Sequence, residues 1–375
     1  MRPEAVAAMQ PFLVEHFANP SGSHAASRAA KTALEAAREE VAALLGARPN
    51  EVVFTAGGSE ADNLAVKGAA WAARETHPER DGVVTTAIEH KAVLGACARL
   101  ERQGFRVSRV PARGSGQVDL DALAGALDER TAVVSVMSAN NETGIVQPLA
   151  EVAAIVRERA PHAVLHTDAV QAPQWLDVRV HAAGADLVAI SAHKFGGPKG
   201  AGALVVRDGV GLVPLIEGGG HERDLRAGTQ NVAGAVALAT ALRITDERRA
   251  EDVTRIAALR DRLERGLAGA IDGFEANGAP AHRVAGVLHG AFPGVEAEAL
   301  LVALDQRGVY AASGSACSSG SIDPSHVLLG MGMPRDRALT SVRFSLGYAS
   351  TDADVEHALA VVPECVDMLT GVRAS

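Results

Sequence analysis

Cysteine is scarce in this chain of 375 residues, and long apolar runs are absent. The three cysteines, Cys97, Cys317 and Cys365, form no CxxC pair and accompany no histidine cluster at ligand spacing, which excludes a disulfide framework and a structural zinc site. No stretch approaches the roughly 20 apolar residues of a membrane helix, and no basic segment followed by an apolar one opens the sequence. We therefore expect a cytoplasmic protein without a resident metal ion.

A surplus of positive charge is also missing, since 36 Lys and Arg residues against 45 Asp and Glu residues give a formal net charge of −9. Such a chain lacks the electrostatic attraction by which proteins bind nucleic acids and anionic membranes, so we expect neither as a direct partner. Aromatic residues make up only 3% of the chain, and hydrophobic residues 47%. This composition indicates a folded protein whose core is built mainly from aliphatic side chains and alanine.

Short β-rich runs alternate with helical patterns, which predicts an α/β fold with a mostly parallel sheet between helices. Strands are expected at 51–55, 82–86, 131–137, 163–167, 186–191 and 202–207, and helices at 27–45, 62–74, 92–103 and 149–159. Ligands of such sheets bind at the carboxyl ends of the strands. A long alanine-rich helical stretch follows residue 231, and we place a domain boundary inside it, with a large domain at 1–244 and a smaller one at 245–375.

Polar residues cluster directly after several of these strands. The segment SAHKFGGPKG places Lys194 behind the strand ending at Ser191. A lysine at the mouth of a pocket can lose its proton on desolvation and form an imine with an aldehyde. On position alone, a solvated loop lysine is the favoured interpretation.

Two further segments follow strands in the same way. Asp168 ends one strand, where a buried carboxylate can keep a heteroaromatic ring nitrogen protonated, although an Asp here can also cap the next helix. The segment TAGGSEADN runs from a strand into a helix, and Gly58 and Ser59 offer free N–H groups and the positive helix end to a phosphate. The segment contains neither GxGxxG nor GKS/T, so a nucleoside triphosphate or NAD is not indicated, and a simple turn remains the alternative.

Cys317 stands in a run of small residues, ASGSACSSGS, with no apolar periodicity. A structural cysteine prefers burial, so this position favours a nucleophile. Cys97 and Cys365 lie in helical patterns and are expected in the core.

Taken together, eight ordered segments resemble the cysteine desulfurases of the NifS/IscS-like branch, pyridoxal-phosphate (PLP) enzymes of the class V aminotransferase group. The likeness covers nearly the whole chain, through FTAGGSEADNLAVKGAA, IEHKAVL, SANNETGIVQPL, HTDAVQ, SAHKFGGPKGAGAL, GGGHERDLRAGTQN, SGSACSSG and SVRFSLG. It implies the type I PLP-dependent transferase fold.

The resemblance also implies a role for each matched residue. Lys194 is the Schiff-base lysine, Cys317 the nucleophile that takes sulfur, and His90 the residue that stacks on the pyridine ring and moves protons. Other residues hold the cofactor: Asp168 at the ring nitrogen, Gln171 at the ring oxygen, and Gly58, Ser59, Ser191 and His193 at the phosphate, with Thr229 reaching in from a second subunit. Arg343 clamps the substrate carboxylate with help from Asn141, which also contacts the cofactor. Without the resemblance, Arg343 reads equally well as an exposed strand arginine and His90 as a helix cap.

The implied reaction converts L-cysteine to L-alanine and leaves a persulfide on Cys317 for a sulfur-acceptor protein, either an iron–sulfur scaffold or a thiolation enzyme. A homodimer follows from the shared pocket, and the only implied metal contact is a transient one between the persulfide and a cluster iron. Relatives usually carry an LDNAATTP-like segment before the region matching Pro3, and its absence here implies a truncated start or an incomplete pocket floor. The alternatives are an aminotransferase, which has no need of Cys317, a selenocysteine lyase, and a non-catalytic sulfur-relay partner.

Overall fold

The computed structural model describes residues 1–314 and 323–371, which form two compact units. The first unit comprises residues 1–110, 120–138 and 148–249, and the second comprises residues 111–119, 139–147 and 250–375. The long helix α8 (Val232–Ala270) contributes to both, and the division falls between Arg249 and Ala250. The boundary that the sequence predicts at 244/245 lies in the same helix.

A seven-stranded sheet forms the centre of the first unit, in the order β1-β7-β6-β5-β4-β2-β3. Strand β7 is antiparallel to both of its neighbours and all other pairs are parallel, so the predicted α/β fold with a mostly parallel sheet is confirmed. The strands are β1 (Val52–Thr55), β2 (Gly82–Thr86), β3 (Arg106–Val110), β4 (Thr131–Ser135), β5 (Val164–Asp168), β6 (Leu187–Ser191) and β7 (Gly202–Val206). Only β3 was not expected from the sequence.

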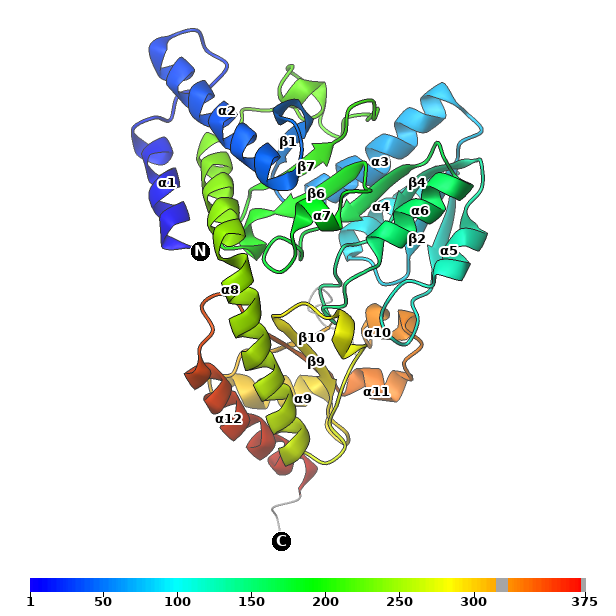
Figure 1. Cartoon of the computed structure of the whole chain (residues 1–375), viewed down its shortest axis with the longest axis vertical. Helices are drawn as coiled ribbons and strands as arrows, with labels where there is room; N and C mark the ends of the chain where they lie inside the picture. The colour runs from blue at the N-terminus through cyan, green and yellow to red at the C-terminus, as the bar shows by residue number, and fades with distance from the viewer. Residues whose placement is uncertain (315–322, 372–375) are drawn as a thin grey trace. The chain divides into compact units, whose positions relative to one another are not determined.

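Helices pack against this sheet, with α3 behind it and α6 in front of it in the view of Figure 1. The helices of the first unit, besides its part of α8, are α1 (Pro3–Val14), α2 (Ala25–Leu45), α3 (Gly58–Thr76), α4 (Lys91–Arg102), α5 (Leu120–Ala126), α6 (Leu149–Arg159) and α7 (Val178–His181). The helix ends follow local chemistry, as α2 shows. Its N-cap His24 accepts a hydrogen bond from the Ser27 N–H, and Gly46 ends it in the left-handed conformation at φ 65°.

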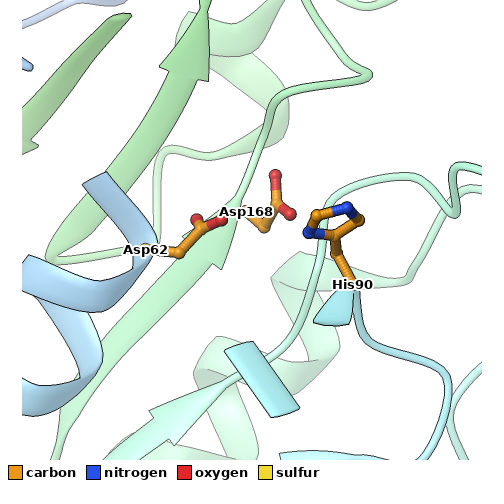
Figure 2. Close-up of side chains that lie close together, drawn as sticks. All are labelled: Asp62, His90 and Asp168. Atoms are coloured by element: carbon orange, nitrogen blue, oxygen red, sulfur yellow. The ribbon is translucent and has the colours of Figure 1, made fainter. Parts of the chain in front are cut away.

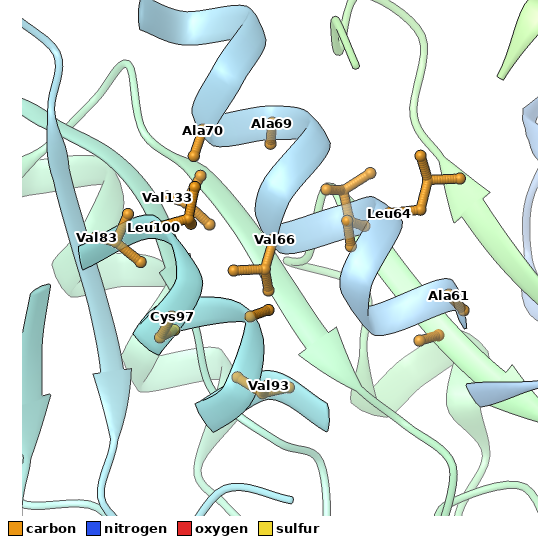
Figure 3. Packing of buried hydrophobic residues seen from close by; sticks show 14 of the residues in the cluster. Ala61, Leu64, Val66, Ala69, Ala70, Val83, Val93, Cys97, Leu100 and Val133 are labelled. Atoms are coloured by element: carbon orange, nitrogen blue, oxygen red, sulfur yellow. The ribbon is translucent and has the colours of Figure 1, made fainter. Parts of the chain in front are cut away.

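The core of the first unit is aliphatic, as the composition predicts. Figure 3 shows Leu64 and Val66 of α3 packed with Val93 and Leu100 of α4, beside strand valines. Cys97 lies in this cluster, fully buried, and burial raises the pKa of its thiol to about 12. Cys97 is therefore an inert core residue, as expected, and Cys365 is buried too.

The second unit contains a four-stranded antiparallel sheet in the order β10-β11-β9-β8. Its strands are β8 (Glu275–Ala276), β9 (Val287–Ala291), β10 (Ala312–Ser313) and β11 (Ser341–Ser345), and its further helices are α9 (Ala297–Asp305), α10 (His326–Gly330), α11 (Arg335–Leu339) and α12 (Asp352–Thr370). Across residues 1–314 and 323–371, no helix is long and apolar enough to cross a membrane.

Candidate active site

The turn between β1 and α3 forms an anion cradle in the first unit. Gly57 takes a φ of 151°, and α3 begins at Gly58 with its first N–H groups free of helical partners. A Cβ atom on Gly58 would lie 2.6 Å from Val170 Cγ2, so glycine lets the turn lie directly against the neighbouring loop. The 19-residue helix adds its positive dipole end, which suits a phosphate.

Three predicted residues stand together at the carboxyl end of β6. Ser191 ends the strand, and a short 3₁₀ helix, η2 (Ala192–Lys194), carries His193 and Lys194. The Ser191 Oγ and His193 Nδ1 are hydrogen-bonded at 2.9 Å. Burial, with the nearby charges of Lys194 and Lys199, lowers the pKa of His193. The imidazole is therefore neutral at pH 7, and Lys194 is exposed beside it.

Asp168 lies at the end of the neighbouring strand β5 and is buried. Its Oδ1 accepts a hydrogen bond from the Val170 N–H at 2.9 Å. Burial raises the pKa of the carboxyl, while the Val170 N–H and the electrostatic influence of His90 and Lys194 act in the opposite direction. The carboxylate can therefore stabilise a cationic ring nitrogen in the cofactor.

His90 caps α4, because its imidazole accepts the Ala92 N–H at 3.2 Å. The same ring faces Asp168, and Figure 2 shows the Asp168 carboxylate between His90 and a third group, Asp62 of α3. One side-chain oxygen or nitrogen of each of the three lies within 4.8 Å of the others. Both interpretations of His90, the helix cap and the site residue, agree with this placement.

Sequence reasoning missed the carboxyl groups of Asp62 and Glu89 and the imidazole of His166, all of which are buried near Asp168. The sequence contains a signal for the burial of Asp62 and of His166. Asp62 lies one helical turn before the buried Ala65 and Val66, so it shares their inward face. His166 stands two residues before Asp168 in one strand and points to the same side of the sheet.

Two predicted substrate residues meet within the second unit. Arg343 on β11 is half-buried and donates from Nη1 to the Asn141 backbone carbonyl at 2.8 Å. The Asn141 Oδ1 is buried and has no hydrogen-bond partner among the residues that the structure describes. Arg343 is thus oriented by a backbone contact, and its planar guanidinium suits a carboxylate.

The remaining predicted residues are Gln171, Thr229 and Cys317. Gln171 is half-buried three residues after Asp168. Thr229 is exposed at the wall of a cavity of about 140 Å³, together with Gly200, Arg226 and Gln230. Cys317 falls outside the described residues.

Comparison with known proteins assigns the family. The family model Aminotransferase class-V matches residues 1–358. The cysteine desulfurase IscS of Clostridium botulinum is 41% identical over 367 residues, which are 97% of this chain and 91% of that protein. The IscS-like cysteine desulfurase of Mycobacterium tuberculosis is 45% identical, over 97% of this chain and 92% of its own. The chain belongs to the class-V aminotransferase family, among its IscS-like cysteine desulfurases.

Solved structures agree with this assignment. A NifS-like protein matches with a TM-score of 0.90 and 34% identity, over 98% of this chain and 96% of its own. A structure described as SspA in complex with cysteine matches with a TM-score of 0.81 and 32% identity, over 94% of this chain and 97% of its own. The fold is therefore the type I PLP-dependent fold, and enzymes of this family are generally PLP-dependent.

The described residues fit such a cofactor. The cradle at Gly58 would be closed by any Cβ atom, the carboxylate of Asp168 is buried and faces a histidine, and Lys194 stands one strand away. A phosphate, a basic ring nitrogen and an aldehyde are the three groups that these features suit.

Proposed function

We propose that this chain is a PLP-dependent cysteine desulfurase, which converts L-cysteine to L-alanine and transfers the sulfur to Cys317. The observation that carries the proposal is the placement of Lys194 and Asp168 at the ends of the adjacent strands β6 and β5, in a chain 41% identical to an IscS desulfurase. Cofactor binding, the residue roles and the dimer are parts of this proposal.

Several residues of the first unit would hold the cofactor. Gly58, Ser59, Ser191 and His193 take the phosphate, Asp168 the ring nitrogen, Gln171 the ring oxygen and Lys194 the aldehyde, with Thr229 added from a second subunit. When bound, the cofactor supplies an electron sink for the carbon that carries the substrate amine. The neutral His193 suits a phosphate because its protonated ring nitrogen donates a hydrogen bond while the other nitrogen pairs with Ser191.

The substrate carboxylate binds Arg343, whose planar guanidinium donates two parallel hydrogen bonds, and Asn141 assists. The backbone contact between Arg343 and the Asn141 carbonyl orients the fork before the substrate arrives. Lys194 and His90 hold and return the protons that leave the substrate during the reaction.

Cys317 acts as a thiolate that attacks the substrate sulfur. A sulfur–sulfur bond forms, the carbon–sulfur bond of the substrate breaks, and the carbon keeps the bonding electron pair and takes up a proton to become the methyl group of alanine. The persulfide on Cys317 then passes its outer sulfur to an acceptor protein, and an acceptor or reductant thiol regenerates the cysteine.

The test compares Cys317→Ser with the matched control Cys365→Ser, which alters a buried cysteine of α12. We expect Cys317→Ser to keep the visible absorbance of bound cofactor and to lose alanine and sulfide formation from L-cysteine. Cys365→Ser should retain both products. Wild-type turnover in Cys317→Ser would remove Cys317 from the reaction.

A further inference from the structure

Behind Asp168 lies a second carboxyl group that the reaction outlined above does not use. Asp62, in the second turn of α3, is 1% exposed, and its Oδ1 has no hydrogen-bond partner among the described residues. Figure 2 shows it on the opposite side of Asp168 from His90. An orphaned buried carboxyl oxygen needs an explanation, because an unpaired charge there would be strongly destabilising.

Among the described residues, the one ion pair that Asp62 makes is with a histidine. The nearest basic group is His166, whose Nε2 lies 3.5 Å from Asp62 Oδ1 and whose Nδ1 is hydrogen-bonded to Ser135 Oγ at 2.9 Å. His166 is fully buried, and burial lowers its pKa to about 3, so the imidazole is neutral at pH 7. A neutral ring at that distance cannot balance a carboxylate.

The other titratable groups around Asp62 separate into two sets. Asp168 on β5 and Glu89 after β2 are acidic and oppose a charge on Asp62. His90 and Lys194 are basic, and they act on Asp168. Two buried carboxyl groups with oxygens within 4.8 Å of each other hold a single negative charge between them, and Asp168 is the one that stands between Asp62 and His90 (Figure 2).

We propose that Asp62 keeps its proton and is a positioning residue for Asp168, confining the single negative charge of the pair to the carboxylate that faces the cofactor ring. Its neutral acid group adds a dipole behind Asp168 without adding charge. The consequence for the cofactor rests on the proposed function, whereas the protonation of Asp62 does not.

The first test uses the protein without cofactor. A carboxyl group that is protonated when folded but ionised when unfolded gives the folded state one extra proton, so stability falls as pH rises above the ordinary Asp pKa of about 4. We expect Asp62→Asn to make the slope of the unfolding free energy against pH less negative between pH 5 and 7, by the amount that about one proton contributes. Glu89→Gln, the matched control, should remove its own proton independently, because burial and the charge of Asp168 raise the pKa of Glu89 to about 8.

An unchanged slope in Asp62→Asn would mean that Asp62 is ionised, and would overturn the proposal. If that variant fails to fold, the infrared carbonyl band of a protonated carboxylic acid in the Glu89→Gln protein decides the matter. The band should persist at pH 8, and its absence would contradict a protonated Asp62.

The second test uses the holoenzyme and the pH titration of its visible absorbance. Asp62→Asn removes no charge, so the titration midpoint should stay at the wild-type value. Asp62→Leu removes the dipole and should shift the midpoint. A shift of the midpoint in Asp62→Asn, or no shift in Asp62→Leu, would overturn the positioning role. If neither the wild type nor any variant binds the cofactor, the proposed function is refuted. The protonation of Asp62, which the first test measures without cofactor, is not affected by that outcome.

Discussion

At the scale of single residues, the account depends on which of several similar side chains carries the chemistry. Lys194 and Lys199 are both exposed lysines of one loop, five residues apart, and only Lys194 lies beside Asp168 in the electrostatic environment of the site. Local sequence alone left Lys194 open as a solvated lysine. Its proximity to Asp168 at the end of β5 makes the distinction.

Lys194→Ala should abolish the visible absorbance of lysine-bound cofactor, because an alanine side chain offers no amine to the aldehyde. Lys199→Ala leaves the Lys194 amine in place and should show the wild-type spectrum after dialysis. Absorption spectra of the two purified variants check the prediction, and a full spectrum in Lys194→Ala would contradict the assignment.

At the scale of elements, the loop before α8 is held by a buried ion pair. Glu222, Arg223 and Asp224 take φ values of 47°, 59° and 63°, three successive left-handed residues that are not glycine. Such a turn is strained, and Glu222 fixes it by accepting two hydrogen bonds from the Arg38 guanidinium, at 2.7 and 2.8 Å, and one from the Phe54 N–H. The loop leads to Thr229, so the pair shapes that wall of the cavity.

Arg38→Met should lower the free energy of unfolding by about 3–5 kcal/mol, because it leaves the Glu222 carboxylate buried without its cation. Arg159→Met, which removes an exposed arginine from its pair with the exposed Glu158, should change stability little. Urea unfolding at pH 7 measures both, and equal effects would refute the role of the buried pair.

A second element-scale feature joins the ends of the segment that contains Cys317. Ser325 caps α10 and donates from Oγ to the buried carboxylate of Glu142, and Gly314 lies against the same carboxylate so closely that a Cβ atom would overlap it. Glu142 therefore contacts both described ends of this segment.

Gly314→Ala should destabilise the protein by about 1–3 kcal/mol, because the added methyl group displaces Glu142. Gly269→Ala is the matched control, since a Cβ there meets no atom within 4 Å and alanine favours the helix α8. Thermal unfolding of both variants checks the contrast. An unchanged melting temperature in Gly314→Ala would show that Glu142 moves aside without loss of stability.

The sequence predicts the positions of helices and strands correctly where the hydrophobic periodicity is strong. The valine-rich strands β2 and β4 and the helix α6 lie where the patterns place them. Strand β3, RVSRV, was missed because its side chains are mostly exposed at the sheet edge, so no buried run marks it. Local periodicity places Asp62 on the inward face of α3 and His166 on the Asp168 side of β5, but the contact between the two side chains depends on how α3 packs on β5, which no local pattern reveals.

At the scale of the whole molecule, the proposal requires two copies of the chain. If Thr229 completes the phosphate site of the partner subunit, a mixed dimer of Lys194→Ala and Thr229→Ala chains contains one site with both residues intact. Mixing the two variants should then restore tight cofactor binding and activity that neither has alone. Retention by dialysis and turnover measure the recovery, and no gain over the Thr229→Ala protein would place Thr229 in its own subunit's site.

The central claim is tested most directly by the reaction itself. The purified chain, supplied with PLP, is given L-cysteine and a reductant, and alanine and sulfide are quantified together. The account predicts a visible cofactor spectrum and equal amounts of the two products. A protein that binds the cofactor and forms neither product from L-cysteine would contradict it.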